Sequence, residues 1–417
     1  MYEFLTKDGF AQFVQQELPQ HFTLSKNLAT VATSGSYNDL SNLPNINTVM
    51  AASPSFYQRA TLPTSAKTTI TIPSMWVNIN NSGYVQNGSV TVNLATSSSW
   101  DASTYATAAN RAGKDFYIYA VQPSSGTVPK IILSANSTVP TGYTASNSRK
   151  IGGFHCLCAD VGTISGHTLS GYVKGNILPA SIWDLYHRPV SSPEGMVWSG
   201  RKWYDIYLAS WNGSKLVSAY GATIADGSSS KSFTGEMFEE EFARAGKMLI
   251  SREDFKDCAY GSNEGTNIYG SADPGTTGGH KDAASRRMIS NIGCEDCCGA
   301  LWQWTRDWWE NSPAIKTGTT LNGAPTYNSD NYKTKTEDRW LHGIGYGVFS
   351  DFSVTNTDVE STARGQTWGI IVRARVGGSW GDGSNCGSRS ANLSSLSSRR
   401  DADKAGRGAS ESRSTAL

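Results

Sequence analysis

The stretch that decides the fold of this chain is Gly293-Cys-Glu-Asp296-Cys-Cys-Gly299-Ala-Leu-Trp302-Gln-Trp304. Its two glycines permit tight turns between crossing strands. Asp296 can accept backbone N–H groups within such a turn. Trp302 and Trp304 would either form a platform for a sugar ring or fill a core that short strands cannot otherwise close. We interpret them as core, because they lie in the turns that define the fold.

Signals for two helices precede this stretch. Thr234 is a plausible N-cap, and Gly246 stands where a helix beginning there would end. Ser251 and Asp254 form the pattern of a capping box, which predicts a second helix to about Ala259. Downstream, the glycine-rich motif Gly377-Gly378-Ser379-Trp380 is closed by Gly406-Arg407-Gly408.

Residues 66–150 carry a different pattern, in which apolar and polar residues alternate. Period two is typical of half-buried strands, and turn formers such as Asn81-Ser-Gly and Gln86-Asn-Gly separate the runs. We therefore expect a small antiparallel β-sandwich. The predicted strands are 69–72, 77–80, 90–94, 115–121 and 130–133, and in the later region 203–208, 345–349 and 368–376.

Composition agrees with a multidomain protein that is β-rich and α+β. The chain has 417 residues, of which 38% are hydrophobic and 17% charged, and its net charge is +1. Such a balance gives no basic footprint for nucleic acid. The first ten residues lack the apolar run of a signal peptide, and no long apolar stretch follows. We therefore expect a soluble protein that is made in a cytoplasm.

The three motifs of the later region resemble, in order and spacing, the C-type lectin fold of the formylglycine-generating-enzyme type. The resemblance covers about 230 residues and implies that the motif residues are structural. That enzyme family uses a pair of cysteines shortly after its G-G-S motif. Here only Cys386 follows, and a single thiol cannot perform dithiol chemistry. The enzymatic activity is therefore not carried over.

Three segments resemble the major tropism determinant family more closely: Ser271–His280, Arg286–Gly299 and Cys386–Ser390. Members of that family are phage tail-tip receptor-binding proteins that a retroelement diversifies. The resemblance implies a homotrimer, a host bacterial surface receptor that is protein or glycan, and a place at the virion tail. It also implies three regions: an N-terminal assembly and trimerisation region (1–65), which would contact other tail proteins, a β-sandwich (66–150), and a C-type lectin domain (151–417) with a linker at 151–187.

The same resemblance makes residues 377–408 the variable region. Template adenines are replaced at random there, so variable codons end in C or T and never encode Lys, Glu, Gln, Met or Trp. The implied receptor-binding positions are Ser379, Gly381, Asp382, Ser384, Asn385, Asn392, Ser394, Ser395, Ser397, Arg399, Asp401 and Asp403. The implied scaffold positions are Asp296, Trp302, Trp304, Trp380, Cys386, Arg389 and Arg407. Small polar residues also fill ordinary surface loops, which remains the alternative interpretation of the variable set.

Metal binding and catalysis are weaker hypotheses. We expect the seven cysteines to be buried thiols, although His155-Cys-Leu-Cys158 and Cys294-Glu-Asp-Cys297-Cys298 could ligate zinc. No cofactor is expected, with calcium at Asn328–Asn331 left open. A glycan depolymerase would need two carboxylates in a cleft, and the candidates by residue type are Glu253, Asp254, Glu295 and Asp296. A bacterial lectin-fold binding protein of fixed specificity is the third alternative.

Overall fold

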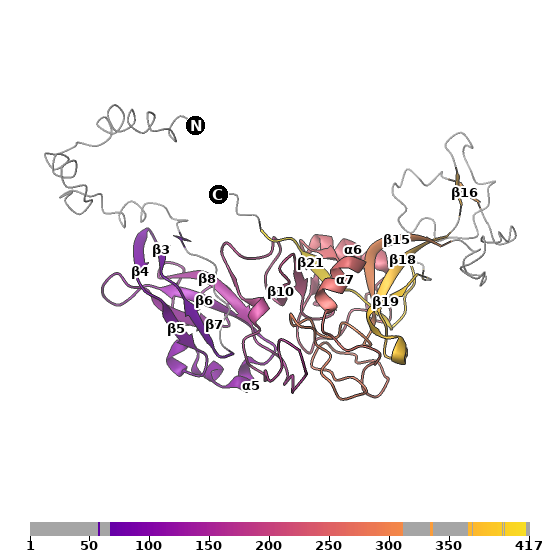
Figure 1. Ribbon diagram of the computed structural model, residues 1–417. Helices are drawn as coiled ribbons and strands as arrows, with labels where there is room; N and C mark the ends of the chain where they lie inside the picture. Colours follow the sequence, from indigo (N-terminus) through magenta and orange to yellow (C-terminus); the bar gives the residue numbers. More distant parts are fainter. Residues whose placement is uncertain are drawn as a thin grey trace, which may run out of the picture.

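The computed structural model describes residues 57–58, 67–311, 334–336, 366–368, 370–393, 395 and 397–413. The expected strand at 345–349, the calcium loop at 328–331 and nearly all of 1–65 lie outside these ranges. The described chain forms two units side by side, the first indigo to magenta and the second salmon to yellow (Figure 1). Within the described residues no helix has the length and hydrophobicity needed to span a membrane.

The first unit is a set of antiparallel sheets around one core. Its sheet orders are β1-β3-β4, β2-β5 and β7-β6-β8-β9. Its helical turns are η4 (Ser97–Ser99), η5 (Ser103–Ala106), α5 (Ala108–Arg111) and η6 (Pro179–Ser181). Its strands are β1 (Tyr57–Gln58), β2 (Thr69–Ile72), β3 (Met75–Ile79), β4 (Ser82–Gln86), β5 (Val90–Asn93), β6 (Asp115–Val121), β7 (Lys130–Ser134), β8 (Ser148–His155) and β9 (Trp183–Asp184).

Strand β6 is buried on both faces. Phe116 and Ile118 point into the core of the first unit, together with side chains from β2, β3, β5, β7 and β8. Tyr117 and Tyr119 point the other way and pack in one cluster with Trp203 of the second unit. This double burial explains why the run is apolar at nearly every position. It also joins the two units through a shared apolar contact.

Among the strands that were not predicted from the sequence, β4 and β8 each have a local reason. β4 begins at Ser82 because Asn80 and Asn81 both take a positive φ and form the hairpin turn themselves. β8 contains two glycines, which usually weaken a strand. At Gly153 a Cβ atom would lie 2.6 Å from the carbonyl oxygen of Phe116, so close packing requires glycine there.

The boundary expected at residue 150 falls inside β8. That strand pairs with β6 along most of its length, and the core of the first unit continues to Ile182. Ile151, Phe154, Cys156, Ile177 and Ile182 belong to the core of the first unit. Leu157, Cys158, Val161, Leu169 and Leu178 pack instead in a core cluster of the second unit, so the segment expected as a linker contributes to both cores.

The second unit is built from short strands and two helices. The helices are α6 (Gly235–Arg244) and α7 (Arg252–Ala259), and both predicted N-caps are confirmed: Thr234 accepts from the backbone of Met237, and Ser251 forms the capping box with Asp254. The strands are β10 (Met196–Trp198), β11 (Trp203–Asp205), β12 (Ser210–Trp211), β13 (Leu216–Val217), β14 (Met248–Leu249), β15 (Trp302–Asn311), β16 (Thr334–Thr336), β17 (Gln366–Trp368), β18 (Ile370–Gly377), β19 (Gly387–Asn392), β20 (Lys404–Ala405) and β21 (Gly408–Ser410).

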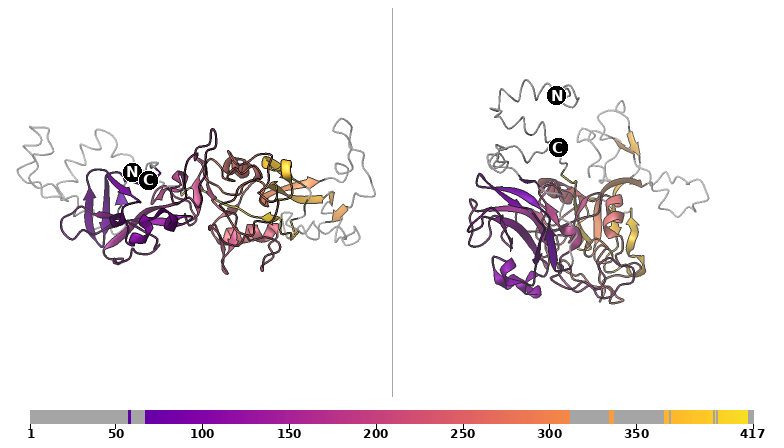
Figure 2. Two further views of the ribbon diagram at one scale, coloured as in Figure 1. Left: turned by 90° about the horizontal axis from the view of Figure 1, so that it is seen from below. Right: turned by 60° about the vertical axis from the view of Figure 1, so that its left-hand side comes forward.

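Two four-stranded sheets organise this unit. In the order β10-β11-β21-β14, the last strand of the chain lies between strands from the start and middle of the unit. In the order β19-β18-β15-β20, the strands that carry residues 370–405 lie together. Two views show β18 and β19 at the end of the molecule away from the first unit (Figures 1 and 2). This position leaves the predicted variable region at the far end of the protein.

Candidate functional site

The candidate site begins where β18 ends in the pair Gly377-Gly378. Both glycines have a positive φ. A Cβ atom at residue 377 would lie 2.5 Å from the carbonyl oxygen of Cys297, and one at residue 378 would lie 2.7 Å from the sulfur of Cys386. Only glycine tolerates both the backbone conformation and the lack of space. The pair therefore sets the direction in which the following turn leaves the sheet.

The turn from Ser379 to Cys386 is held by its own hydrogen bonds. The Oδ2 atom of Asp382 accepts from the backbone N–H of Ser379 at 2.7 Å and from its hydroxyl at 2.6 Å. The backbone N–H of Trp380 donates to Ala300 at 2.9 Å, and that of Cys386 donates to Gly383 at 3.2 Å. A turn fixed in this way can present side chains without an ordering cost on binding.

A second segment, Arg399–Asp403, returns the chain to the sheet. Lys404 is buried, and its ammonium contacts both Asp401 and Asp403, the latter at 2.7 Å. Its hydrogen bond is the main reason that the pKa of Asp401 lies below its usual range. The carbonyl oxygen of Asp401 also accepts from the backbone of Gly227 at 3.1 Å. The segment is thus anchored from both sides.

The predicted receptor-binding positions divide by exposure. Gly381, Ser384, Asn385 and Arg399 are exposed, and Asp382, Asn392, Asp401 and Asp403 are partly exposed. These eight positions remain available for contact with a partner. Ser394 lies outside the described residues.

The structure corrects the expectation for Ser379, Ser395 and Ser397, which are buried at 6%, 0% and 1% exposure. The Ser379 hydroxyl is used within the turn, and that of Ser397 contacts Glu236 on α6. The carbonyl of Ser397 accepts from Gly235 at 2.8 Å, which fixes this part of the chain against the helix. In this conformation the three serines cannot touch a receptor.

Three predicted scaffold residues are structural. Trp302 and Trp304 are buried, so they belong to the core. Asp296 is fully buried at φ 54° and accepts from the backbone of Gly278 at 2.7 Å and from His280 at 3.0 Å. Asp296 thus accepts one backbone N–H group, but from Gly278 and not from within its own turn as expected.

Arg407, one of the predicted scaffold positions, satisfies backbone carbonyls. It has no exposed surface and donates to the carbonyls of Asp205, Ile206 and Glu295 at 2.6–2.8 Å. It also donates to the side chain of Gln303 at 2.8 Å. One side chain thereby ties the end of β11 to the Glu295–Asp296 turn and to β15.

Trp380 and Cys386 lie next to the turn, Trp380 half-buried and Cys386 buried. Burial raises the pKa of the Cys386 thiol to about 11, so this group is a neutral thiol at physiological pH. Arg389 differs from the expectation for a scaffold residue because its side chain is exposed on β19.

The residues considered for metal binding and glycan hydrolysis are buried or already contact other residues of the chain. All seven cysteines are buried free thiols. No group of three or more His, Cys, Asp or Glu is placed to hold a metal in the described part of the chain. Glu295 is buried against Arg287 at 2.6 Å, Asp254 caps α7, and Glu253 pairs with Arg201 at 3.2 Å.

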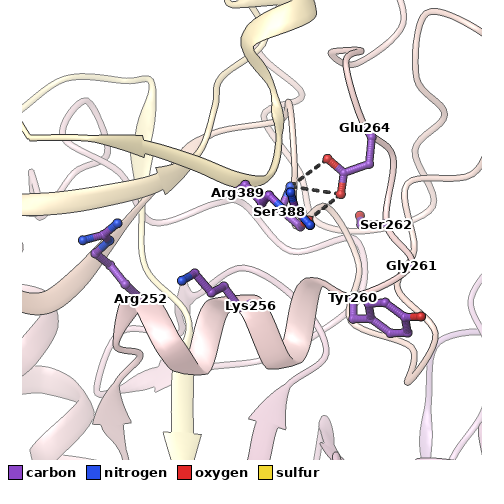
Figure 3. Close-up of a pocket in the computed structure, with 8 residues that line it drawn as sticks. All are labelled: Arg252, Lys256, Tyr260, Gly261, Ser262, Glu264, Ser388 and Arg389. Carbon is purple, nitrogen blue, oxygen red and sulfur yellow. Dashed lines mark hydrogen bonds between the residues drawn. The ribbon is translucent and has the colours of Figure 1, made fainter.

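Sequence reasoning missed a surface pocket of about 800 Å³ between α7 and β19 (Figure 3). It is lined by Arg252, Lys256, Tyr260, Gly261, Ser262, Glu264, Ser388 and Arg389. Two stretches far apart in the sequence, 252–264 and 388–389, contribute these residues, so no local motif indicates the pocket. Only the alternation of charge on the predicted helix 252–259 could have drawn attention to it.

The fold and the site define a class: a β-rich multidomain protein with a rigid, polar face on a loop-rich unit at one end. Residues 67–184 match the family described as the Mtd second domain. The tail fibre receptor-binding protein of Bordetella phage BPP-1 is 33% identical over 213 residues, which is 46% of this chain and 54% of that protein. The matched stretch thus spans about half the length of that relative.

Solved structures of major tropism determinant variants are also similar. The U1 variant has a TM-score of 0.58 at 25% identity, with 87% of this chain and 84% of that one covered. The M1 and P3c variants give the same TM-score and coverage at 24% identity. The resemblance to the major tropism determinant family is confirmed by these matches, and the overall fold is shared over most of the chain.

Proposed function

We propose that this chain is the receptor-binding protein of a phage tail and determines which host bacterium the phage adsorbs to. The observation that carries the proposal is the turn 379–386: a backbone held by internal hydrogen bonds presents exposed small residues at the far end of the molecule. The relatives are named as tail fibre receptor-binding and tropism-determining proteins, which supports the same role here.

The finer parts of the proposal follow the same relatives. The second unit is a C-type lectin fold domain, the chain assembles as a homotrimer, and residues 1–65 attach it to other proteins of the virion tail. Its role is binding without catalysis, and a trimer on a multi-copy tail strengthens weak single contacts by avidity.

A retroelement diversifies the exposed face in this proposal. The positions that can vary most freely are the exposed Gly381, Ser384, Asn385 and Arg399, since substitution of exposed residues usually costs little stability. The partly exposed Asp382, Asn392, Asp401 and Asp403 can vary too, although the three aspartates also form contacts that hold this face. Deep sequencing of the 3′ end of the gene in a propagated population should find substitutions there, in codons ending in C or T. An invariant 3′ end would remove diversification from the proposal and leave a binding protein of fixed specificity.

The direct test is adsorption of the purified full chain to a panel of bacterial strains. Ser384→Tyr and Asn385→Tyr should change binding to the adsorbed strain by about tenfold or more, the range found for residues central to an interface. Ser124→Tyr, at an exposed position of the first unit, is the matched control and should bind normally. Unchanged adsorption by both turn variants would contradict the proposed face. Release of reducing ends from host glycan above a heat-killed control would show that the chain is a depolymerase.

A further inference from the structure

Helix α7 separates its charges onto two sides. Glu253 pairs with Arg201, and Asp257 accepts from the hydroxyls of Ser199 at 2.7 Å and Tyr204 at 2.9 Å. These acidic side chains therefore turn toward β10, β11 and the loop between them. Arg252 and Lys256, four residues apart, share the side that lines the pocket (Figure 3). The helix is nearly balanced in charge, but its pocket side is positive.

The opposite wall adds another cation. Arg389 projects from β19 on the far side of the pocket from α7 (Figure 3). Lys256 and Arg389 are both exposed, and neither forms an ion pair with any residue in the described ranges. Charged side chains with no partner of their own can pair with a ligand without first breaking an internal contact.

Glu264 is the one carboxylate in the lining, and it is already used. It accepts from the backbone N–H of Ser388 at 3.1 Å and from its hydroxyl at 2.5 Å. Gly265 donates to the carbonyl of Cys386 at 2.8 Å. The loop thereby occupies backbone groups at the start of β19 that an added peptide strand would need. The pocket suits a compact charged group better than an extended peptide.

The rim carries one large flat side chain. Tyr260, directly after α7, is 72% exposed, and its ring lies at the end of the pocket beyond Lys256 (Figure 3). An aromatic ring beside hydroxyls and cations is suited to a sugar, whose ring has an apolar C–H face and polar substituents. A volume of about 800 Å³ accommodates a few sugar residues.

We propose that this pocket binds the acidic group, carboxylate or phosphate, of a host-surface saccharide. Arg389 and Lys256 hold the anion from opposite walls, and Tyr260 stacks on the adjoining sugar ring. Arginine suits this role because its planar fork matches the oxygens of both anions. The inference rests on the proposed receptor-binding function and names the chemistry of its target. It adds a second contact area beside the exposed turn of the variable region.

Binding of the full-length chain to immobilised saccharides tests this inference. The probes are polygalacturonate for carboxylate, dextran phosphate for phosphate, and unmodified dextran as the neutral control. Lys256→Glu and Arg389→Glu should each weaken binding to an acidic probe by about tenfold or more, since a charge-assisted contact becomes a repulsive one. Raising the salt from low to high concentration should weaken binding by the wild type. Tyr260→Ala should weaken it less.

Lys130→Glu is the matched control, because Lys130 is exposed on β7 in the first unit. It should bind the acidic probes like the wild type. Whichever acidic probe binds identifies the anion. Equal binding by the wild type and both pocket variants would overturn the inference, and so would equal binding to unmodified dextran. An acidic peptide that competes as well as the saccharide would also overturn it.

The same variants separate this inference from the proposed function. If the wild type adsorbs to bacteria but binds no acidic saccharide, the pocket inference fails and the receptor-binding function stands. If the chain binds an acidic saccharide through Lys256 and Arg389 but adsorbs to no strain of the panel, the pocket is upheld and the proposed function is not.

Discussion

The two units of this protein reach stability by different means. Most strands of the first unit have four to eight residues, and their apolar side chains enclose one core. The second unit has several strands of only two or three residues, so much of its backbone lies outside regular ladders. Buried polar groups must still be hydrogen-bonded. In the second unit, buried arginine side chains supply many of those bonds.

The buried arginines illustrate this difference in how the two units satisfy their backbone hydrogen bonds. Arg111 is the fully buried arginine of the first unit, and it donates to the carbonyls of Leu94, Tyr105, Ala106 and Gly175, which all lie outside the strands. The second unit buries Arg287, Arg373 and Arg407 to the same degree. Where strands do not satisfy the backbone, a rigid fork of N–H donors does. A loop-rich unit can thereby stay rigid enough to present a fixed binding face.

The largest expected effect comes from removing one such arginine. Arg407→Met should lower the free energy of unfolding by about 4 kcal/mol, because four acceptors lose their donor at about 1 kcal/mol or more each. Urea titration followed by tryptophan fluorescence measures this loss. Arg400→Met, at an exposed position, is the control and should stay within about 0.5 kcal/mol of the wild type. Equal stability of the two variants would show that the hydrogen bonds of buried Arg407 do not stabilise the second unit.

Within the predicted variable region, substitution by tyrosine should lower the free energy of unfolding more at buried serines than at an exposed one. This difference should be smaller than the effect of removing Arg407. Tyrosine is among the residues that a diversified codon can encode. Ser395→Tyr and Ser397→Tyr should cost about 1–3 kcal/mol, since both side chains point into packed surroundings. Ser384→Tyr should change stability by less than about 0.5 kcal/mol, because that side chain is exposed. If all three variants unfold at the same urea concentration, residues 395–397 belong to the exposed face after all.

The smallest expected effect is a dependence on pH in the second unit. Burial alone would raise the pKa of Asp254, but hydrogen bonds from Ser251 and from Lys202 hold it below its ordinary value of 3.8. Ionised Asp254 therefore favours the folded state above about pH 5, and this contribution is lost as the pH falls through the lowered pKa. Asp254→Asn should cost about 1 kcal/mol at pH 7, as for other helix caps.

The difference between wild type and Asp254→Asn should shrink toward zero below about pH 3. Urea titrations of both proteins at pH 7, 5 and 3 measure it, and comparing the two at each pH removes the effect of other carboxylates. A difference that stays constant over this range would show that ionisation of Asp254 does not contribute.

Local patterns predicted much of the fold. Strand β6 has the bounds expected from its apolar run, and β2, β3, β5 and β7 lie within a residue or two of the expected ranges. Both helices of the second unit begin at their predicted caps. These features depend on hydrogen bonds and periodicities within a few residues, which a single sequence displays directly.

The candidate site was less predictable. The composition of residues 377–408 is uniformly small and polar, so it could not distinguish exposed Ser384 from buried Ser395 and Ser397. Ser397 is held against α6, more than 150 residues earlier in the chain, by contacts with Gly235 and Glu236. Ser395 lies against β18, where its carbonyl accepts from the backbone of Arg373. The assignment of Arg389 to the scaffold failed because the local sequence does not show where its strand lies in the sheet. In the structure β19 lies at the edge of its sheet, next to β18, and Arg389 is exposed there.

The sequence by itself determined most longer strands of the first unit, both helices of the second, the glycine turn at 377–378 and the core role of Trp302 and Trp304, because each depends on short-range sterics or on hydrophobicity. Only the tertiary structure decided which residues of the variable region face outward, and only it brought Lys256, Tyr260 and Arg389 around one pocket. The physical reason is that exposure and pocket formation are set by contacts between distant segments, which no local pattern encodes.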